Sequence, residues 1–286
     1  MAPPAPFEPA VGEGDPWPPE VAPDFTKVTA GVSRTLAPWR DYPPARENEA
    51  LFLAMIGAAR RCIYMENQYF TSPVIAEALA ARLAEPEGPQ VILISTKHSP
   101  SWFDQITMDR TRSNFLLRLR RADPHHRLGA YYPVTEAGAL IIVHAKLAVI
   151  DDRLLRIGSA NVNNRSMGFD SECDLSFEVD GDGDPASAAR MAAIRAELVG
   201  HWLGCPAAEV VAAEAREAGL VGAIEALRAA GANRLRSIET APLGPIAALI
   251  ARYHMGDPAG PGDSWRPWRR RAELEAMVER IRPPVP

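Results

Sequence analysis

A histidine and a lysine lie two residues apart within an apolar segment near the middle of the chain. The segment VHAKLAVIDDRLLRIGSANVNNRS spans residues 143–166 and contains His144 and Lys146. Side chains two apart on a strand lie on the same face, so we expect this imidazole and this cation to share one site. An imidazole can attack phosphorus or protonate a leaving oxygen, and a lysine stabilises charge on the non-bridging oxygens. The pair therefore indicates chemistry on a phosphate ester.

Short polar side chains follow downstream beside a glycine. Ser159 and Asn161 are two residues apart, and Gly158 precedes them. A glycine lets the backbone come close to a ligand, while a hydroxyl and an amide offer hydrogen bonds to it. Together with the histidine and the lysine, these residues form the predicted phosphate cradle. Such a set requires neither a metal ion nor an organic cofactor, and we expect none.

An aspartate nearby looks like a further member of the set, but its position argues otherwise. Asp151 lies an odd number of residues from both His144 and Lys146, so in a regular strand it faces the opposite side. Asp151 and Asp152 together are typical of a hairpin turn. We therefore expect Asp151 to hold the turn or a backbone contact instead of the phosphate.

Alternating strand-like and helix-like segments must hold these side chains in place. Ser72 is a predicted helix N-cap, with Pro73 at the first helical position. The wholly apolar segment 91–96 predicts a strand that is buried on both faces. Other predicted strands cover 27–35, 63–70, 129–134, 139–150, 153–159 and 173–180, and predicted helices cover 45–62, 73–85 and 101–122. The alternation predicts layers of an α/β fold.

The chain divides into three predicted parts. Residues 1–26 are rich in proline, which blocks helix and central strand, so we expect an extended linker or arm. Residues 27–181 form the predicted α/β lobe, and residues 182–286 a helical extension that packs on it. Near the end, WRPWRRR (265–271) predicts a solvated helix start, although tryptophan and arginine also suit the headgroup region of a membrane surface.

Composition limits the classes of function. The net charge of −5 and the pI near 5.8 argue against a protein whose main task is to bind nucleic acid. Cys62, Cys173 and Cys205 show neither disulfide-framework nor zinc-site spacing. No apolar run is long enough to span a membrane, and no signal peptide is visible. We expect a cytoplasmic protein that can touch a membrane surface peripherally.

The complete spacing resembles the signature of the phospholipase D superfamily, in the form His144-x-Lys146-x4-Asp151-x6-Gly158-Ser159-x-Asn161. The segments IYMENQYF and SANVNNRSMGFDSECDL are also similar to the C-terminal lobe of bacterial two-lobed phospholipase D and cardiolipin-synthase-like proteins. The resemblance covers roughly residues 15 to 240. It implies a central mixed β-sheet flanked by helices, with a helical C-terminal extension.

The resemblance implies a mechanism with two histidines. In that family one histidine forms a phosphohistidine intermediate and a second one protonates the leaving alcohol. Similarity to the second motif favours the acid and base role for His144. The resemblance further implies that Lys146, Ser159 and Asn161 bind the phosphate and that Glu172, or alternatively Asp170, hydrogen-bonds the far nitrogen of His144. It also implies that Asn67 and Gln68 line the site.

This chain supplies one motif where the chemistry needs two, because no other histidine is followed by x-Lys. It is the C-terminal half of a two-motif protein, or it pairs with a second copy of itself, or it is a non-catalytic half-site that binds lipid. The expected function is a phosphodiesterase or phosphatidyltransferase acting on phospholipids. The enzyme alternative is a homodimeric, single-motif nuclease-like phosphodiesterase.

Overall fold

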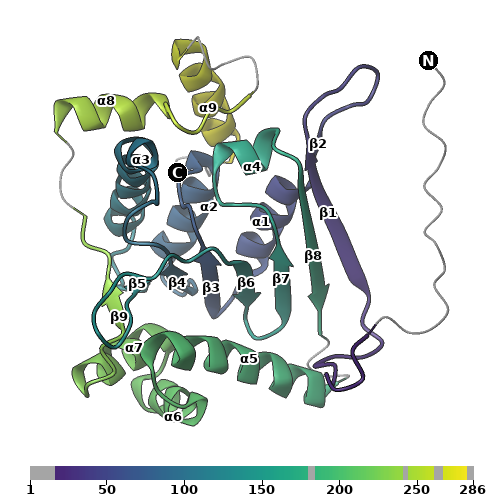
Figure 1. Cartoon of the computed structure of the whole chain (residues 1–286), viewed down its shortest axis with the longest axis vertical. Helices are drawn as coiled ribbons and strands as arrows, with labels where there is room; N and C mark the ends of the chain where they lie inside the picture. The colour runs from purple at the N-terminus through teal and green to yellow at the C-terminus, as the bar shows by residue number, and fades with distance from the viewer. Residues whose placement is uncertain (1–16, 180–183, 241–243, 261–266, 282–286) are drawn as a thin grey trace.

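A mixed β-sheet runs through the centre of the molecule, with helices on both of its faces (Figure 1). The computed structural model describes residues 17–179, 184–240, 244–260 and 267–281. Within these residues the sheet has nine strands in the order β2-β1-β8-β7-β6-β3-β4-β5-β9. The pairs β3/β4 and β4/β5 are parallel, and the other neighbours are antiparallel. The predicted α/β lobe with a central mixed sheet is confirmed.

The strands are short and the helices vary from one turn to five or more. The strands are β1 Ala30–Leu36, β2 Ala45–Arg46, β3 Cys62–Asn67, β4 Gln90–Ile94, β5 Leu128–Pro133, β6 Lys146–Ile150, β7 Leu154–Gly158, β8 Glu172–Glu178 and β9 Leu235–Ser237. The helices are α1 Glu47–Ala58, α2 Pro73–Ala84, α3 Trp102–Arg121, α4 Asn164–Gly168, α5 Pro185–Leu203, α6 Ala207–Glu217, α7 Leu220–Ala229, α8 Pro245–Tyr253 and α9 Pro267–Ile281.

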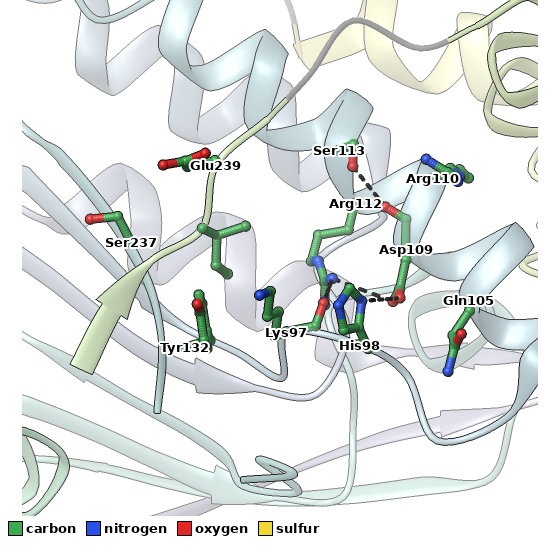
Figure 2. Close-up of a pocket in the computed structure, with 11 residues that line it drawn as sticks. Lys97, His98, Gln105, Asp109, Arg110, Arg112, Ser113, Tyr132, Ser237 and Glu239 are labelled. Carbon is green, nitrogen blue, oxygen red and sulfur yellow. Dashed lines mark hydrogen bonds and ion pairs between the residues drawn. The ribbon is translucent and has the colours of Figure 1, made fainter. Parts of the chain in front are cut away.

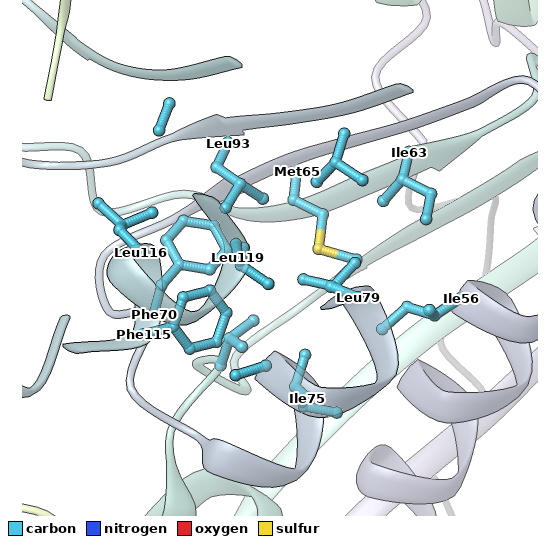
Figure 3. Close-up of a cluster of buried hydrophobic side chains, with 14 of the residues drawn as sticks. Ile56, Ile63, Met65, Phe70, Ile75, Leu79, Leu93, Phe115, Leu116 and Leu119 are labelled. Atoms are coloured by element: carbon cyan, nitrogen blue, oxygen red, sulfur yellow. The ribbon is translucent and has the colours of Figure 1, made fainter. Parts of the chain in front are cut away.

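Two apolar cores cover the two faces of the sheet. On one face, side chains from β3 and β4 such as Met65 and Leu93 pack against α1, α2 and α3 (Figure 3). On the other face, Tyr64 and Ile92 pack against α5, α6 and α7. Strand β4 therefore contributes alternate side chains to both cores, which explains why its sequence is continuously apolar. The double burial predicted for this strand is confirmed.

Local signals in the sequence mark the ends of α2 and α3. The hydroxyl of Ser72 accepts a hydrogen bond from the backbone N–H of Ile75 at 3.4 Å, and Pro73 begins α2 as predicted. The hydroxyl of Ser101 likewise accepts from the backbone N–H of Asp104 at 3.0 Å. Both side chains satisfy amide groups that have no partner inside the helix.

Strand β6 is shorter than the sequence predicts, and this correction concerns the histidine directly. The predicted strand began at residue 139, whereas β6 begins at Lys146. Just before it, the Thr96 hydroxyl accepts from the Val143 N–H at 2.8 Å and donates to the Val143 carbonyl at 3.2 Å. The Thr96 side chain thus takes the backbone groups of Val143 that would otherwise pair with a neighbouring strand. His144 therefore lies in the irregular segment that leads into β6.

The C-terminal part of the chain is not purely helical. Its strand β9 pairs antiparallel with β5 and forms an edge of the main sheet. The loop after α8 also reaches back to the lobe, because the buried carboxylate of Asp257 accepts from the Thr71 hydroxyl at 2.8 Å and the Asn164 N–H at 2.9 Å. Residues of this part therefore add the last strand of the sheet and brace the segments before α2 and at the start of α4.

The two ends of the chain carry the remaining predictions. Of the predicted arm, residues 17–26 are described and contain no helix or strand, and the Phe25 ring packs edge-on against Phe177. Of the Trp/Arg cluster, residues 265–266 and the side chains of 267–271 lie outside the described residues. Among the helices that the structure describes, none combines the length and the apolar character needed to cross a membrane.

Candidate active site

The candidate residues gather at one edge of the sheet. Strands β3, β4, β5 and β7 end at this edge, whereas β6 and β8 begin there. The register places Lys146 opposite Asn67, and Gly158 opposite Asp174 near the start of β8. His144 directly precedes β6 at the same edge. Antiparallel pairing thus brings together residues that are far apart in the sequence.

His144 and Lys146 differ in their surroundings. His144 is exposed, and the described residues form no hydrogen bond with its ring. Lys146 is half-buried, and its Nζ donates to the His144 carbonyl at 2.9 Å. Burial lowers the pKa of Lys146, which the charge of Glu172 partly offsets and the charge of Arg156 reinforces. The cation is held close to the histidine backbone, and the imidazole is free to meet a ligand.

Glu172 binds hydroxyl groups in this structure. One carboxylate oxygen accepts from the Ser159 hydroxyl at 2.5 Å, and the other accepts from the Ser166 hydroxyl at 2.6 Å. The Ser159 oxygen in turn accepts from the Cys173 N–H at 3.0 Å. Among the described residues no hydrogen bond joins Glu172 to His144, so its role in fixing the histidine tautomer stays a prediction. The observed contacts orient Ser159 at the edge of the site.

Asp170, the alternative partner for the histidine, contacts a different residue. Its carboxylate lies 3.1 Å from Nε of Arg165, and this ion pair is partly exposed. The backbone N–H of Asp170 also donates to the Arg165 carbonyl at 2.9 Å. These contacts hold Asp170 in the turn after α4, and the described structure does not join it to His144.

Asn161 has an unpaired polar atom. Its Oδ1 is buried and has no hydrogen-bond partner among the described residues, although the residue as a whole is half-buried. A buried polar atom without a partner costs free energy, and native structures usually supply a partner for it. Because the oxygen and nitrogen of an amide can exchange places by rotation, the amide is suited to hydrogen-bond a ligand here. The unpaired amide supports the contact between Asn161 and a phosphate, which stays a prediction.

Asn67 and Gln68 lie at the edge of the site, but their amides contact the protein. Asn67 is only 1% exposed; its Nδ2 donates to the Ala160 carbonyl at 3.4 Å, and its Oδ1 accepts from the Val162 N–H at 3.2 Å. The amide of Gln68 donates to the Tyr69 hydroxyl at 3.2 Å. Asn67 therefore fixes the residues on both sides of Asn161, which makes it a positioning residue in this structure.

Asp151 lies at the other end of β6, in the hairpin turn that the sequence predicts. Its carboxylate accepts from the backbone N–H groups of Arg60, Arg61 and Cys62 at 2.7, 2.7 and 2.8 Å. Asp151 and Asp152 have φ values of 56° and 57°, which aspartate tolerates in turns. At the rise of an extended strand, seven residues separate Asp151 from His144 by roughly 20 Å. Asp151 holds the turn and is remote from the candidate site.

A buried ion pair, which the sequence did not predict, lies next to the backbone of Ser159. Arg156 and Asp174 are both 0% exposed, and Nε of Arg156 donates to Oδ2 of Asp174 at 2.8 Å. The other carboxylate oxygen accepts from the backbone N–H groups of Ser159 at 2.9 Å and Ala160 at 3.1 Å. Arg156 also donates to the Ala160 carbonyl at 2.8 Å. The pair thus fixes the backbone that presents the serine and the asparagine.

The same ion pair explains the glycine of the motif. A Cβ atom added to Gly158 would lie 1.9 Å from Oδ1 and 2.6 Å from Cα of Asp174. The position therefore excludes a side chain because the carboxylate fills that space. One signal in the sequence could have revealed the pair: Arg156 interrupts the apolar strand LLRIG at an inward-facing position, two residues from Gly158. A buried arginine requires a carboxylate partner.

The site has the donors for a phosphate. Within the described part of the chain, no group of three or more histidine, cysteine, aspartate or glutamate residues could hold a metal ion. An exposed imidazole, a half-buried ammonium group, a hydroxyl and an amide lie instead at one edge. Such an arrangement can bind a phosphate oxygen and transfer a proton to a leaving alcohol.

The fold and the residues at its edge define an α/β lobe of the phospholipase D type. Residues 52–191, just under half of the chain, match the family described as "Cardiolipin synthase, PLD-like domain". Over these residues the chain is similar to the phospholipase D superfamily. A curated relative, a phospholipase D of Phytophthora infestans, is 22% identical over 189 residues; the match covers 52% of this chain and 10% of that protein. The chain thus spans a small part of that relative.

Solved structures with this type of fold are also similar to the chain. Nuc, a phospholipase D family member from Salmonella typhimurium, is 17% identical with a TM-score of 0.36 and covers 57% of this chain and 91% of its own. NucT from Helicobacter pylori is 18% identical with a TM-score of 0.39, and the match covers 57% of this chain and 94% of NucT. Phosphatidylserine synthase from Haemophilus influenzae is 14% identical with a TM-score of 0.42, and the match covers 57% of this chain and 37% of the synthase.

Proposed function

We propose that this chain is one half-site of a phospholipase D-type phosphodiesterase or phosphatidyltransferase that acts on phospholipids. The observation that carries the proposal is the arrangement of His144, Lys146, Ser159 and Asn161 at one edge of the sheet. The exposed imidazole and the unpaired amide oxygen are the groups there that have no protein partner among the described residues. A phosphodiester oxygen can accept from the imidazole and, once the Asn161 amide is rotated, from its Nδ2.

In this proposal the two half-sites divide the chemistry. A histidine of the second half-site attacks phosphorus, so that a P–N bond forms while the P–O bond to the leaving alcohol breaks. His144 gives its proton to the departing oxygen. Lys146 and Asn161 stabilise the charge on the non-bridging oxygens. His144, now neutral, then takes a proton from water or from a second alcohol, whose oxygen attacks phosphorus and releases the first histidine.

The second half-site comes from a second copy of this chain or from another lobe of the same kind. The single His-x-Lys motif supports this requirement, because a phosphohistidine mechanism uses one histidine as nucleophile and another as acid. The exposure of His144 also agrees with it, since a substrate must lie between the two lobes. In a symmetric pair, a twofold axis would place the two copies of His144 close to each other.

The test is covalent trapping of the phosphoryl group together with a dilution series. A short-chain phosphatidylglycerol with labelled phosphorus should leave acid-labile label on the protein, and His144→Ala should abolish turnover. His125→Ala, which removes an exposed loop histidine, is the matched control and should leave turnover unchanged. If two copies form the site, turnover per chain should fall on dilution. Turnover that survives in His144→Ala would contradict the proposal.

The same experiment distinguishes the alternatives. Faster cleavage of single-stranded DNA than of phosphatidylglycerol would identify a nuclease-like phosphodiesterase. No turnover at any protein concentration, together with liposome binding that survives His144→Ala, would identify a non-catalytic lipid-binding lobe. The first result would overturn the proposed phospholipid chemistry, and the second would overturn a site formed by two copies of this chain.

A further inference from the structure

A polar pocket opens where β4 and β5 end (Figure 2). It has a volume of about 510 Å³ and lies between the loop after β4, the middle of α3 and the segment after β9. We call it the Lys97 pocket. Its lining residues are Lys97, His98, Gln105, Asp109, Arg110, Arg112, Ser113, Tyr132, Ser237, Ile238 and Glu239.

The Lys97 pocket is tied to the segment that carries His144. Lys97 directly follows Thr96, whose hydroxyl makes both hydrogen bonds to the backbone of Val143. His144 is the next residue after Val143. The neighbouring Ser95 hydroxyl donates to the Gln68 carbonyl at 3.0 Å, which fixes the ends of β4 and β3 side by side. The pocket and the site therefore share one edge of the sheet.

Cations with no carboxylate partner line this pocket. Lys97 is half-buried, and its Nζ lies 5.0 Å from the centre of the Tyr132 ring. Arg110 is exposed. Within the described residues, neither side chain forms an ion pair. Both charges can therefore serve a ligand.

Hydrogen bonds from a buried arginine hold the loop that carries Lys97. Arg112 is only 5% exposed, and its guanidinium donates to the backbone carbonyls of Thr96 and Lys97. Burial lowers the pKa of this arginine, and the charge of Asp109 opposes that effect. A loop fixed in this way loses little entropy when a ligand binds.

Of the two carboxylates that line the pocket, Asp109 is already engaged. Asp109 accepts from the Ser99 hydroxyl at 2.6 Å and lies 3.6 Å from Nδ1 of His98 and 3.4 Å from Nη2 of Arg112. Glu239 interacts electrostatically with Arg120, outside the pocket lining. Nδ1 of the His98 ring faces Asp109, so Nε2 is the ring nitrogen left for a ligand. Lys97 and Arg110 outnumber Glu239, so the side chains of the pocket without an ion pair carry a net positive charge.

We infer that the Lys97 pocket binds a second acidic group, a phosphate or a carboxylate, of the phosphodiester whose reacting phosphate lies at His144. Lys97 supplies the charge, and His98 in its imidazolium form supplies a hydrogen-bond donor from Nε2. The inference rests on the proposed function, because that function places the reacting phosphate. It gives the chain a preference for phospholipids with an acidic head group over those with a neutral or zwitterionic one.

The test uses the imidazole signals of the full chain in NMR, with inorganic phosphate as the probe at constant ionic strength. Phosphate should shift the signals of both His98 and His144. Lys97→Ala should weaken the apparent affinity reported by His98 by at least about tenfold, the usual size of a lost charged hydrogen bond, and leave the His144 response in place. Arg60→Ala, which removes an exposed cation at the opposite edge, is the matched control and should change neither response.

Binding of short-chain lipids then separates the sources of the acidic group. The chain should bind phosphatidylserine, with its carboxylate, more tightly than phosphatidylcholine, and Lys97→Ala should remove most of this difference. A His98 signal that ignores phosphate, or that responds equally in Lys97→Ala, would overturn the inference. A His144 signal that ignores phosphate while His98 responds would overturn the proposed function and the substrate assignment that rests on it, but not anion binding in the Lys97 pocket.

Discussion

Replacement of Asp174 by asparagine is the sharpest test of how the active-site loop is held. The two carboxylate oxygens of Asp174 face different donors: Oδ2 accepts from Arg156, and Oδ1 accepts from the N–H groups of Ser159 and Ala160. An asparagine has one acceptor oxygen, and its NH₂ group must face N–H donors on the other side. Asp174→Asn therefore leaves either the arginine or the loop without an acceptor, at a position with no access to water.

The expected cost follows from the burial of both partners. Both side chains of the ion pair have 0% exposure, so Asp174→Asn leaves the Arg156 charge buried and unpaired. Breaking a buried pair in this way costs about 3–5 kcal/mol of the free energy of unfolding. Glu178→Gln is the matched control, because it also changes a carboxylate to an amide on β8 opposite an arginine, Arg153. That pair is 40–50% exposed, so the control should cost less than about 1 kcal/mol.

The assay is urea unfolding followed by circular dichroism, with the phosphate response of His144 as a second readout. A double variant, Arg156→Met with Asp174→Leu, should recover most of the lost stability because it removes both charges. It should still lose the phosphate response, because the Ala160 N–H loses its acceptor and the Ser159 N–H keeps only the Cys173 carbonyl, at 3.3 Å. The reasoning is refuted if Asp174→Asn costs no more than Glu178→Gln. It is equally refuted if the double variant binds phosphate normally.

Three further predictions follow from single contacts. Asn67→Ala should lower the free energy of unfolding by about 2 kcal/mol in urea unfolding, because it leaves backbone groups on both sides of Asn161 without partners; a loss below about 0.5 kcal/mol would contradict the positioning role. Lys146→Met should abolish the phosphate response of His144 but change the free energy of unfolding by less than about 1 kcal/mol, since burial already lowers the pKa of this lysine. Burial raises the pKa of Asp257 from 3.8 to about 6, so its contribution to stability is present below about pH 4 and is lost as pH rises through 6. The difference in free energy of unfolding between the wild type and Asp257→Asn should therefore fall between pH 4 and pH 7, and a difference that rises with pH would refute this assignment.

Short-range patterns in the sequence predict much of the frame around the site. The apolar run in β4 predicts burial on both faces, because alternate side chains must enter opposite cores. Ser72 and Pro73 mark the start of α2, because a hydroxyl and a proline suit the unpaired amides of a first turn. The pair Asp151-Asp152 predicts the hairpin turn, and the parity of Asp151 relative to Lys146 keeps it off the face of the phosphate. Each of these predictions depends on neighbours within a few residues.

The start of β6 shows where such reasoning ends. The apolar letters from 139 to 150 favour one long strand, but the Thr96 hydroxyl takes the backbone groups of Val143 and ends the ladder before His144. Thr96 is 47 residues away from Val143. No local pattern reports which distant side chain will reach a given backbone group.

The sequence by itself determined the chemical types of the site: an imidazole and an ammonium group at one strand end, and a hydroxyl and an amide after a glycine. Only the tertiary structure decided what holds and surrounds them. Asp174 lies under Gly158, Asn67 braces the loop of Asn161, and the Lys97 pocket opens at the same edge of the sheet as His144. The physical reason is that periodicity and turn chemistry act over a few residues, whereas a buried charge or amide takes its partner from wherever the packing of the sheet brings one.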